Sequence, residues 1–268
     1  MQHASDDQGA MAQATPYPHA RERNLILVML LALAGAAWAV LWWQSSSADD
    51  TMMSLTMGMS APLFIAVWIV MMVAMMFPTA SPMILMFSRI QSGKRARGQS
   101  FVSVWLFTGT YLAVWSMAGV AAYGAATGAG HLADRYMWLI DHAEQIGGIV
   151  LIAAGVYQLT PLKHACLSKC RTPMSFVMRS WRDGTAGAIR MGGEHALYCL
   201  GCCWFLFAIL FPLGIMNVGI MALITVLIFA EKSLPGGPRI AMLAAAALVA
   251  YGAAVTSGLA GLPGMTMA

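Results

Sequence analysis

Long runs of apolar residues, separated by short polar stretches, organise this chain. Six such blocks follow one another, at about 24–43, 63–87, 101–127, 140–162, 196–229 and 240–261. A helix needs about 20 apolar residues to cross the hydrocarbon core of a membrane. The pattern therefore predicts an all-α protein, a polytopic bundle of transmembrane helices. The composition agrees, since 10% of the residues are charged, against about 25% in soluble domains.

The fifth block is too long for a single span, because a helix over it would rise about 50 Å. It contains Pro212, Gly214 and Asn217, so we expect a break there, with Asn217 as a helix cap or a cavity residue. The block then forms two helices, or one helix and a re-entrant segment, and the total is six or seven spans. Lys232 and Arg239 favour a cytoplasmic link before the last span, which implies seven.

Basic residues gather in two of the polar stretches, 89–97 and 163–190. The positive-inside rule places both in the cytoplasm. Residues 1–22 are polar and are predicted to be a disordered tail. Residues 23–268 form a single transmembrane domain, whose first helix is retained rather than cleaved as a signal, and whose loop 163–195 is basic, cysteine-containing and cytoplasmic. The expected partner is the lipid bilayer. Nucleic acid is not expected, because the sequence contains no folded basic domain that would bind it.

Five cysteines lie in or beside the second basic stretch: Cys166, Cys170, Cys199, Cys202 and Cys203. An odd number excludes complete pairing, and a cytoplasmic location keeps thiols reduced. In HALYCLGCCW, which starts at His195, the His195, Cys199 and Cys202 side chains fall within about 60° of one another on a helix, and Cys203 widens this face to about 100°.

One helix does not supply all the ligands of a metal ion, because His195 and Cys203 lie about 12 Å apart along its axis. Cys166 and Cys170, four residues apart, are the expected second source of thiolates, which are ligands for soft metals such as Cu(I). We therefore predict a soft-metal transfer site. Structural zinc, thiol redox chemistry and simple packing of small apolar cysteines are the alternatives.

A methionine stripe follows in the second block. Its members lie within about 140° on a helix, and they are Met71, Met72, Met75, Met76, Met83 and Met86. Thioethers are neutral ligands that suit Cu(I) and cost less in hydrocarbon than carboxylates do. Pro78 and Pro82 each remove a helical hydrogen bond and are expected to bend the axis. The alternative is that methionine fills gaps between helices.

Further methionines lie on the side that the basic stretches leave as extracytoplasmic. The segment from Asp49 to Ser60 holds two aspartates and four methionines, Met52, Met53, Met57 and Met59. A thioether forms no disulfide, so methionine is a suitable copper ligand there, and we expect this loop to exchange the ion with a partner. A floppy loop with chance methionines is the alternative. At the end of the fifth block, Glu231 and Lys232 are expected to pair with each other, and the alternative is that they form part of a path for ions.

Several motifs together resemble a family of predicted metal-binding integral membrane proteins, whose copper-handling member is a membrane copper chaperone for a bacterial tyrosinase. The motifs are WIVMMVAMMFPTASPM (68–83), CLSKCRTPMSF (166–176), WRDG (181–184), HALYCLGCCW (195–204), GIMN (214–217) and EKSLPGG (231–237). The resemblance covers about residues 63–240. A glycine often follows the histidine of the cysteine motif, where this chain has Ala196. The resemblance implies metal binding, and copper by way of that one member.

Taken together, these features predict a membrane protein of the bacterial inner membrane that binds Cu(I) and is not an enzyme. It acts as a copper chaperone or copper transfer protein, with a cuproprotein client or a copper-delivering protein as partner. The predicted ligands are Cys199, Cys202, Cys203, His195, Cys166, Cys170, Met71, Met72, Met75, Met76 and Met83. A structural zinc protein and a membrane thiol oxidoreductase are the alternatives.

Overall fold

The computed structural model describes residues 18–47, 56 and 58–263. Within these residues the chain is helical and no strand occurs, which confirms the predicted all-α class. The helices are α1 (Pro18–Ser47), α2 (Ala61–Ala96), α3 (Val104–Arg135), α4 (Met137–Asp141), α5 (Ala143–Gln158), α6 (Pro161–Arg171), α7 (Pro173–Ser180), α8 (Gly184–Ala208), α9 (Leu210–Leu213), α10 (Val218–Ser233) and α11 (Gly237–Thr256).

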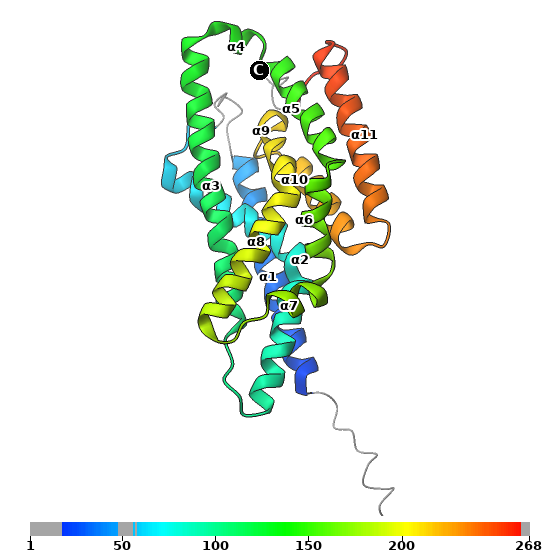
Figure 1. Ribbon diagram of the computed structural model, residues 1–268. Coiled ribbons are helices and arrows are strands. Elements are labelled where there is room, and N and C mark those ends of the chain that lie inside the picture. Colours follow the sequence, from blue (N-terminus) through cyan, green and yellow to red (C-terminus); the bar gives the residue numbers. More distant parts are fainter. Residues whose placement is uncertain (1–17, 48–55, 57, 264–268) are drawn as a thin grey trace, which may run out of the picture.

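The longer helices run up and down in alternation, in the order α1, α2, α3, α5, α8, α10 and α11 (Figure 1). The start of α1 meets the end of α2, because Ser92 donates a hydrogen bond to Glu22 at 2.7 Å. At the opposite end, Gly147 of α5 lies against both Pro212 and Leu262. The described chain therefore ends on the side opposite to the start of α1.

In the described part of the chain, five helices are long and apolar enough to cross a membrane, namely α1, α2, α3, α11 and the stretch from α8 to Leu213. The number becomes six if α5 and α6, which meet at 62°, are one broken span. Six agrees with the lower predicted number. The helix that a seventh span requires is α10, whose 16 residues rise only about 24 Å.

Two predicted boundaries differ from the structure. Helix α1 begins at Pro18, so the last five residues of the predicted tail are helical, while residues 1–17 lie outside the described part. The predicted loop 163–195 is not a loop: it comprises most of α6, all of α7 and the first turns of α8. Thr160, whose hydroxyl accepts a hydrogen bond from the Lys163 backbone at 3.3 Å, caps α6 and starts this helical stretch.

Helix α2 continues through both of its prolines, and each backbone carbonyl that a proline leaves without an amide partner finds another donor. Pro78 has no N–H to give the carbonyl of Ala74, and the Trp38 indole of α1 donates to that oxygen instead, at 3.1 Å. Pro82 frees the carbonyl of Pro78, which accepts from the Ser81 hydroxyl at 2.8 Å. These contacts matter because an unpaired carbonyl is costly in an apolar interior.

Helices α5 and α11 pack antiparallel at close range through small residues. A Cβ added to Gly148 would lie 2.9 Å from the carbonyl oxygen of Gly252, and one added to Gly252 would lie 2.6 Å from that of Gly148. About two turns further on, Gly155 faces the carbonyl of Ala245 in the same way, at 2.8 Å. Such small-residue contacts let helix backbones approach closely where water does not drive association.

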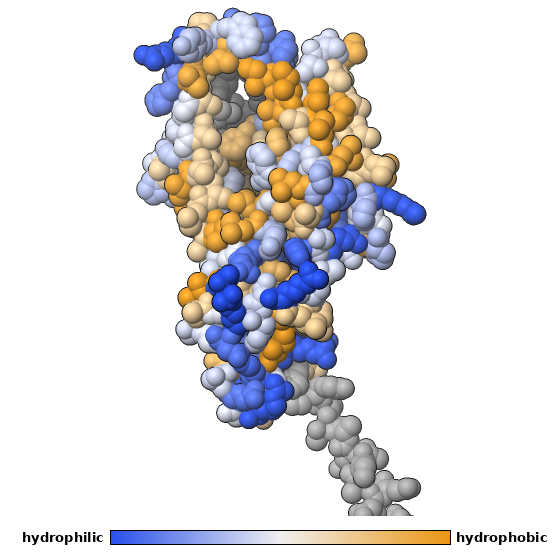
Figure 2. Space-filling model, viewed as in Figure 1, coloured by the Kyte–Doolittle hydropathy of each residue, from blue (hydrophilic) through white to orange (hydrophobic). Residues whose placement is uncertain are grey.

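Large apolar side chains cover much of the outer surface. Among them Trp42, Met117, Leu223 and Leu243 are each more than 60% exposed. Figure 2 shows apolar colour over the upper part of the molecule, below a hydrophilic rim, with more hydrophilic surface lower down. Contiguous apolar surface of this extent marks a face that lipid or protein covers.

The Trp38 contact gives a testable prediction about α2. Replacing Trp38 by Phe removes the indole donor and leaves the Ala74 carbonyl unpaired, so the free energy of unfolding should fall by about 1–3 kcal/mol. Thermal unfolding of the detergent-solubilised protein measures this. The matched control is Trp42→Phe on the exposed side of the same helix, and equal melting temperatures for the two variants would contradict the assignment.

Candidate metal centre

Helix α8 carries three of the five cysteines. The WRDG motif fixes the position of the first residues of this helix. Asp183, the residue before α8, forms an ion pair with Lys94 at the end of α2 and accepts a hydrogen bond from the Trp181 indole at 3.0 Å. The bond from Lys94 lowers the pKa of Asp183. The Trp181 ring packs against Phe87 with 5.9 Å between ring centres. The motif therefore sets the position of α8 relative to α2.

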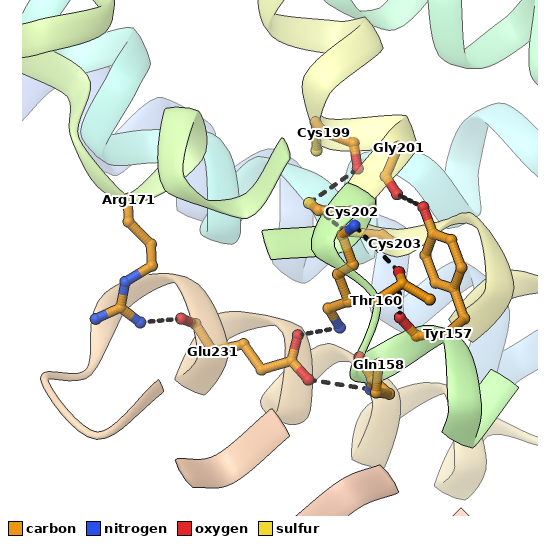
Figure 3. Close-up of polar contacts among 10 residues, drawn as sticks. Tyr157, Gln158, Thr160, Arg171, Cys199, Gly201, Cys202, Cys203 and Glu231 are labelled. Carbon is orange, nitrogen blue, oxygen red and sulfur yellow. Dashed lines mark hydrogen bonds and ion pairs between the residues drawn. The ribbon is translucent and has the colours of Figure 1, made fainter. Parts of the chain in front are cut away.

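One face of α8 carries His195, Cys199, Cys202 and Cys203, and all four are at most 3% exposed. Cys202 Sγ lies 3.2 Å from Cys203 Sγ and 3.1 Å from the carbonyl oxygen of Cys199, to which it donates. These cysteines lie together at the end of α8 that faces α6 (Figure 3). The face expected from helical periodicity is thus present, and it points into the protein.

Helix α6 brings a fourth thiol to this face. Helix α6 packs against α8, and Cys170 lies near enough to Cys199 and Cys202 for the thiols to influence one another. Cys166, one turn earlier, does not join them in the same way: its sulfur packs against α8 at Gly201, 2.7 Å from where a Cβ would stand. We call Cys170, Cys199, Cys202 and Cys203 the thiol cluster. All of its members are free cysteines.

Two further polar groups contact the thiol cluster from helices outside the cysteine motifs. Lys232 of α10 donates to Cys199 Sγ at 3.0 Å and is 8% exposed. The Tyr111 hydroxyl of α3 lies 3.1 Å from the same sulfur. The predicted pairing of Glu231 with Lys232 is therefore wrong, because neighbouring residues on a helix point in different directions and each finds its own partner.

Glu231 instead holds the end of α10 against α5 and α6. Its carboxylate accepts from Lys163 Nζ at 2.6 Å and from the Gln158 amide at 3.1 Å. Arg171 donates to the backbone oxygens of Glu231 and, at 2.8 Å, of Leu234. Figure 3 shows Glu231 between Arg171 and Gln158. Lys163 and Glu231 are nearly fully buried, so their charges need each other.

Sequence reasoning missed these partners for different reasons. Charged residues such as Lys163, Glu231 and Lys232, placed at the ends of apolar blocks, are a signal, since a charge at such a boundary needs a partner. Nothing in the sequence distinguishes Tyr111 within its apolar helix.

His195 lies among aromatic rings rather than among sulfurs. Its imidazole stacks on Tyr111 and Phe107, with ring centres 5.6 and 6.1 Å apart, and Phe176 covers it at 5.7 Å. The buried Nδ1 has no hydrogen-bond partner among the described residues. His195 lies one turn before Cys199 and therefore next to the thiol cluster, and its role as a ligand stays a prediction.

The predicted methionine ligands are in the core. Met71, Met72, Met75, Met76 and Met83 are each at most 3% exposed. They belong to α2, which packs against α1, α3 and α10. Met86 is half-buried. Of the methionines predicted to be extracytoplasmic, Met59 is described, whereas Met52, Met53 and Met57 lie outside the described residues, as do Asp49 and Asp50.

The donors do not form a preformed high-coordination site. Within residues 18–47, 56 and 58–263, no group of three or more His, Cys, Asp or Glu side chains is arranged to hold a metal ion. Pairs of thiols nevertheless lie in contact, as the 3.2 Å separation of the Cys202 and Cys203 sulfurs shows. Thiols in contact can supply ligands to a soft metal.

A family model described as "PpoB2: Copper chaperone" matches residues 65–255. The chain belongs to the PpoB2 copper chaperone family. The resemblance seen in the motifs is therefore confirmed. No curated protein and no solved structure matches the chain in the corresponding comparisons. The region shared with the PpoB2 family contains the thiol cluster, Lys232 and the methionines of α2, while α1 and Met59 precede it.

The buried Lys163–Glu231 pair gives a prediction for this PpoB2 family member. Lys163→Met leaves a buried carboxylate without its cation and should lower the free energy of unfolding by about 3–5 kcal/mol. The double variant Lys163→Met, Glu231→Gln removes both charges and should recover most of that loss. Lys169→Met on the same helix is the control, and thermal unfolding is the measurement. A double variant as unstable as the single one would contradict the pairing.

Proposed function

We propose that this protein is a membrane-embedded carrier of Cu(I), which its thiol cluster captures at the cytoplasmic face and passes toward a cuproprotein. The observation that carries the proposal is the contact of a buried ammonium group, Lys232, with Cys199, beside the touching sulfurs of Cys202 and Cys203 and with the free thiol of Cys170 nearby. The family adds a copper chaperone role in general terms. In this proposal copper is the cargo, and the protein is not an enzyme.

The membrane placement rests on the helices and on their charges. The long apolar helices and the exposed apolar surface suit a bilayer. The basic residues at the end of α2 and those of α6 and α7 suit the cytoplasmic side of a bacterial inner membrane. The thiol cluster then lies close to that boundary, since Lys232 at the end of α10 contacts it.

The proposed binding of Cu(I) depends on the softness of the sulfur ligands and on the charge of the complex that they form. Two thiolates holding one Cu(I) ion form a complex with one net negative charge, which is unfavourable in an apolar surrounding. The Lys232 ammonium, 3.0 Å from Cys199 Sγ, compensates that charge inside the protein. Burial of the sulfurs also keeps water from the bound ion. The neutral thioethers along α2 then offer soft ligands deeper in the protein.

Copper loading tests the proposal. After anaerobic loading, the wild-type protein should retain Cu(I), and the variant with Cys199→Ser, Cys202→Ser and Cys203→Ser should lose most of it while remaining folded by thermal unfolding. Cys166→Ser is the matched control, because that sulfur packs against Gly201. Metal analysis after loading with Cu(I) or with Zn²⁺ distinguishes this proposal from a structural zinc protein. Zinc that is retained tightly and removed only by unfolding would favour the zinc protein and contradict the copper proposal. Turnover through a redox-active disulfide would favour the oxidoreductase.

The compensating charge gives a second test. Lys232→Met should weaken Cu(I) binding by at least about tenfold, the equivalent of about 1.4 kcal/mol, because the bound complex loses its counter-charge. Lys232→Arg keeps the charge and should retain most of the affinity. Competition with a chromogenic Cu(I) chelator measures both variants, and equal affinities for Lys232→Met and wild type would contradict this role of Lys232.

A further inference from the structure

A small cleft lies near the end of α10 that is remote from the thiol cluster. Its lining residues are Met59, Met71 and Met216, together with Phe64, Val67, Trp68 and Ile215. Met216 precedes α10 and Lys232 ends it, and 16 residues of helix separate them by about 24 Å. The cleft and the thiol cluster are therefore near opposite ends of α10.

The three methionines come from three separate segments. Met59 precedes α2, Met71 belongs to α2, and Met216 lies in the break between α9 and α10. The backbone of this break is fixed at both sides: Gly214 has φ of 100°, which a side chain disfavours, and the Asn217 side chain caps α10 by accepting from the Ile220 amide at 3.1 Å. This cap, which the sequence predicted as one of two roles for Asn217, holds the neighbouring Met216 in place.

The arrangement differs from that of methionines which merely fill space. A flexible thioether used as filler closes gaps between helices, whereas here the three methionines border a gap that stays open. Met71 is 3% exposed and lies deepest, while Met59 and Met216 are half-buried. Two of the three methionines are thus partly exposed at the surface.

The lining selects one class of ligand. Among the described lining residues none carries a carboxylate or a hydroxyl. The polar group of Trp68, its indole N–H, already donates to the Trp115 carbonyl at 2.9 Å. Water needs two or more polar partners, and hard cations need oxygen ligands, so neither suits this cleft. Three neutral thioethers suit a soft monovalent ion.

We propose that Met59, Met71 and Met216 form a second metal site, a thioether site for Cu(I) or a chemically similar monovalent ion such as Ag(I). The inference rests on the proposed copper function, to which it adds the place where the ion leaves. From the thiol cluster the ion reaches this site past α10 and the methionines of α2, which pack against each other. Transfer from thiolates to thioethers exchanges ligands of similar softness, and no oxidation or reduction takes place.

Silver binding to the full chain in detergent tests the site, because Ag(I) is a redox-stable soft monovalent ion. The background is the variant with Cys199→Ser, Cys202→Ser and Cys203→Ser, in which the main thiolates are absent. This protein should still bind one Ag(I), more weakly than the wild-type thiols bind a soft ion, so that it still loses most of its tightly held Cu(I). Adding Met59→Leu, Met71→Leu and Met216→Leu should weaken that binding at least about tenfold, since leucine has nearly the same volume and no sulfur. Binding should release no proton, because a thioether carries none.

The matched control replaces three exposed methionines, Met117, Met178 and Met242, by leucine in the same background, and it should bind as before. Met59→Leu alone, at a half-buried position, is the variant to use if the triple change unfolds the protein, and it should weaken binding as well. Silver binding that is absent from the cysteine variant, or that the cleft substitutions leave unchanged, would overturn the thioether site. The proposed function fails separately, if the cysteine variant retains wild-type Cu(I).

Discussion

Two adjacent charged residues at the end of α10, Glu231 and Lys232, hold α5, α6 and α8 together around the thiol cluster. Burial makes each of them unfavourable without a partner of opposite charge or strong polarity. Glu231 points to Lys163 and Gln158, and Lys232 points to Cys199. Because these partners belong to α5, α6 and α8, satisfying both charges fixes three helices around the end of the fourth.

That constraint also explains why the cysteines have a defined arrangement. Cys170 reaches the sulfurs of α8 only because α6 folds back at 62° to α5 and because Arg171 holds its end to the α10–α11 turn. The EKSLPGG motif therefore has a structural reason in this chain: it supplies both the charges and the backbone oxygens that assemble the thiol cluster. In the proposed function, a soft ion in the cluster would have a fixed positive charge, that of Lys232, beside it.

In the half of the protein away from the thiol cluster, the helices are held together by contacts between uncharged groups. They meet through backbone and small residues, as at Gly148 and Gly252, and through indole donors, as at Trp38 and Trp68. These contacts satisfy polar backbone groups without adding charge. The sulfurs found there are neutral as well. The two proposed sites thus match their surroundings, with thiolates beside an ammonium at one end of α10 and thioethers without charge at the other.

The sequence by itself determined those features that depend on residues close together in the chain. Apolar blocks predicted the helices, the Pro212–Asn217 segment predicted the break, and the spacing of His195, Cys199 and Cys202 predicted their common face, because helical geometry depends only on neighbours along the chain. Only the tertiary structure decided that Cys170 and not Cys166 faces the other thiols, that Lys232 turns to Cys199, and that Met59, Met71 and Met216 line one cleft. Those contacts join residues far apart in the chain, and their geometry follows from how helices pack and from which partner each buried charge finds.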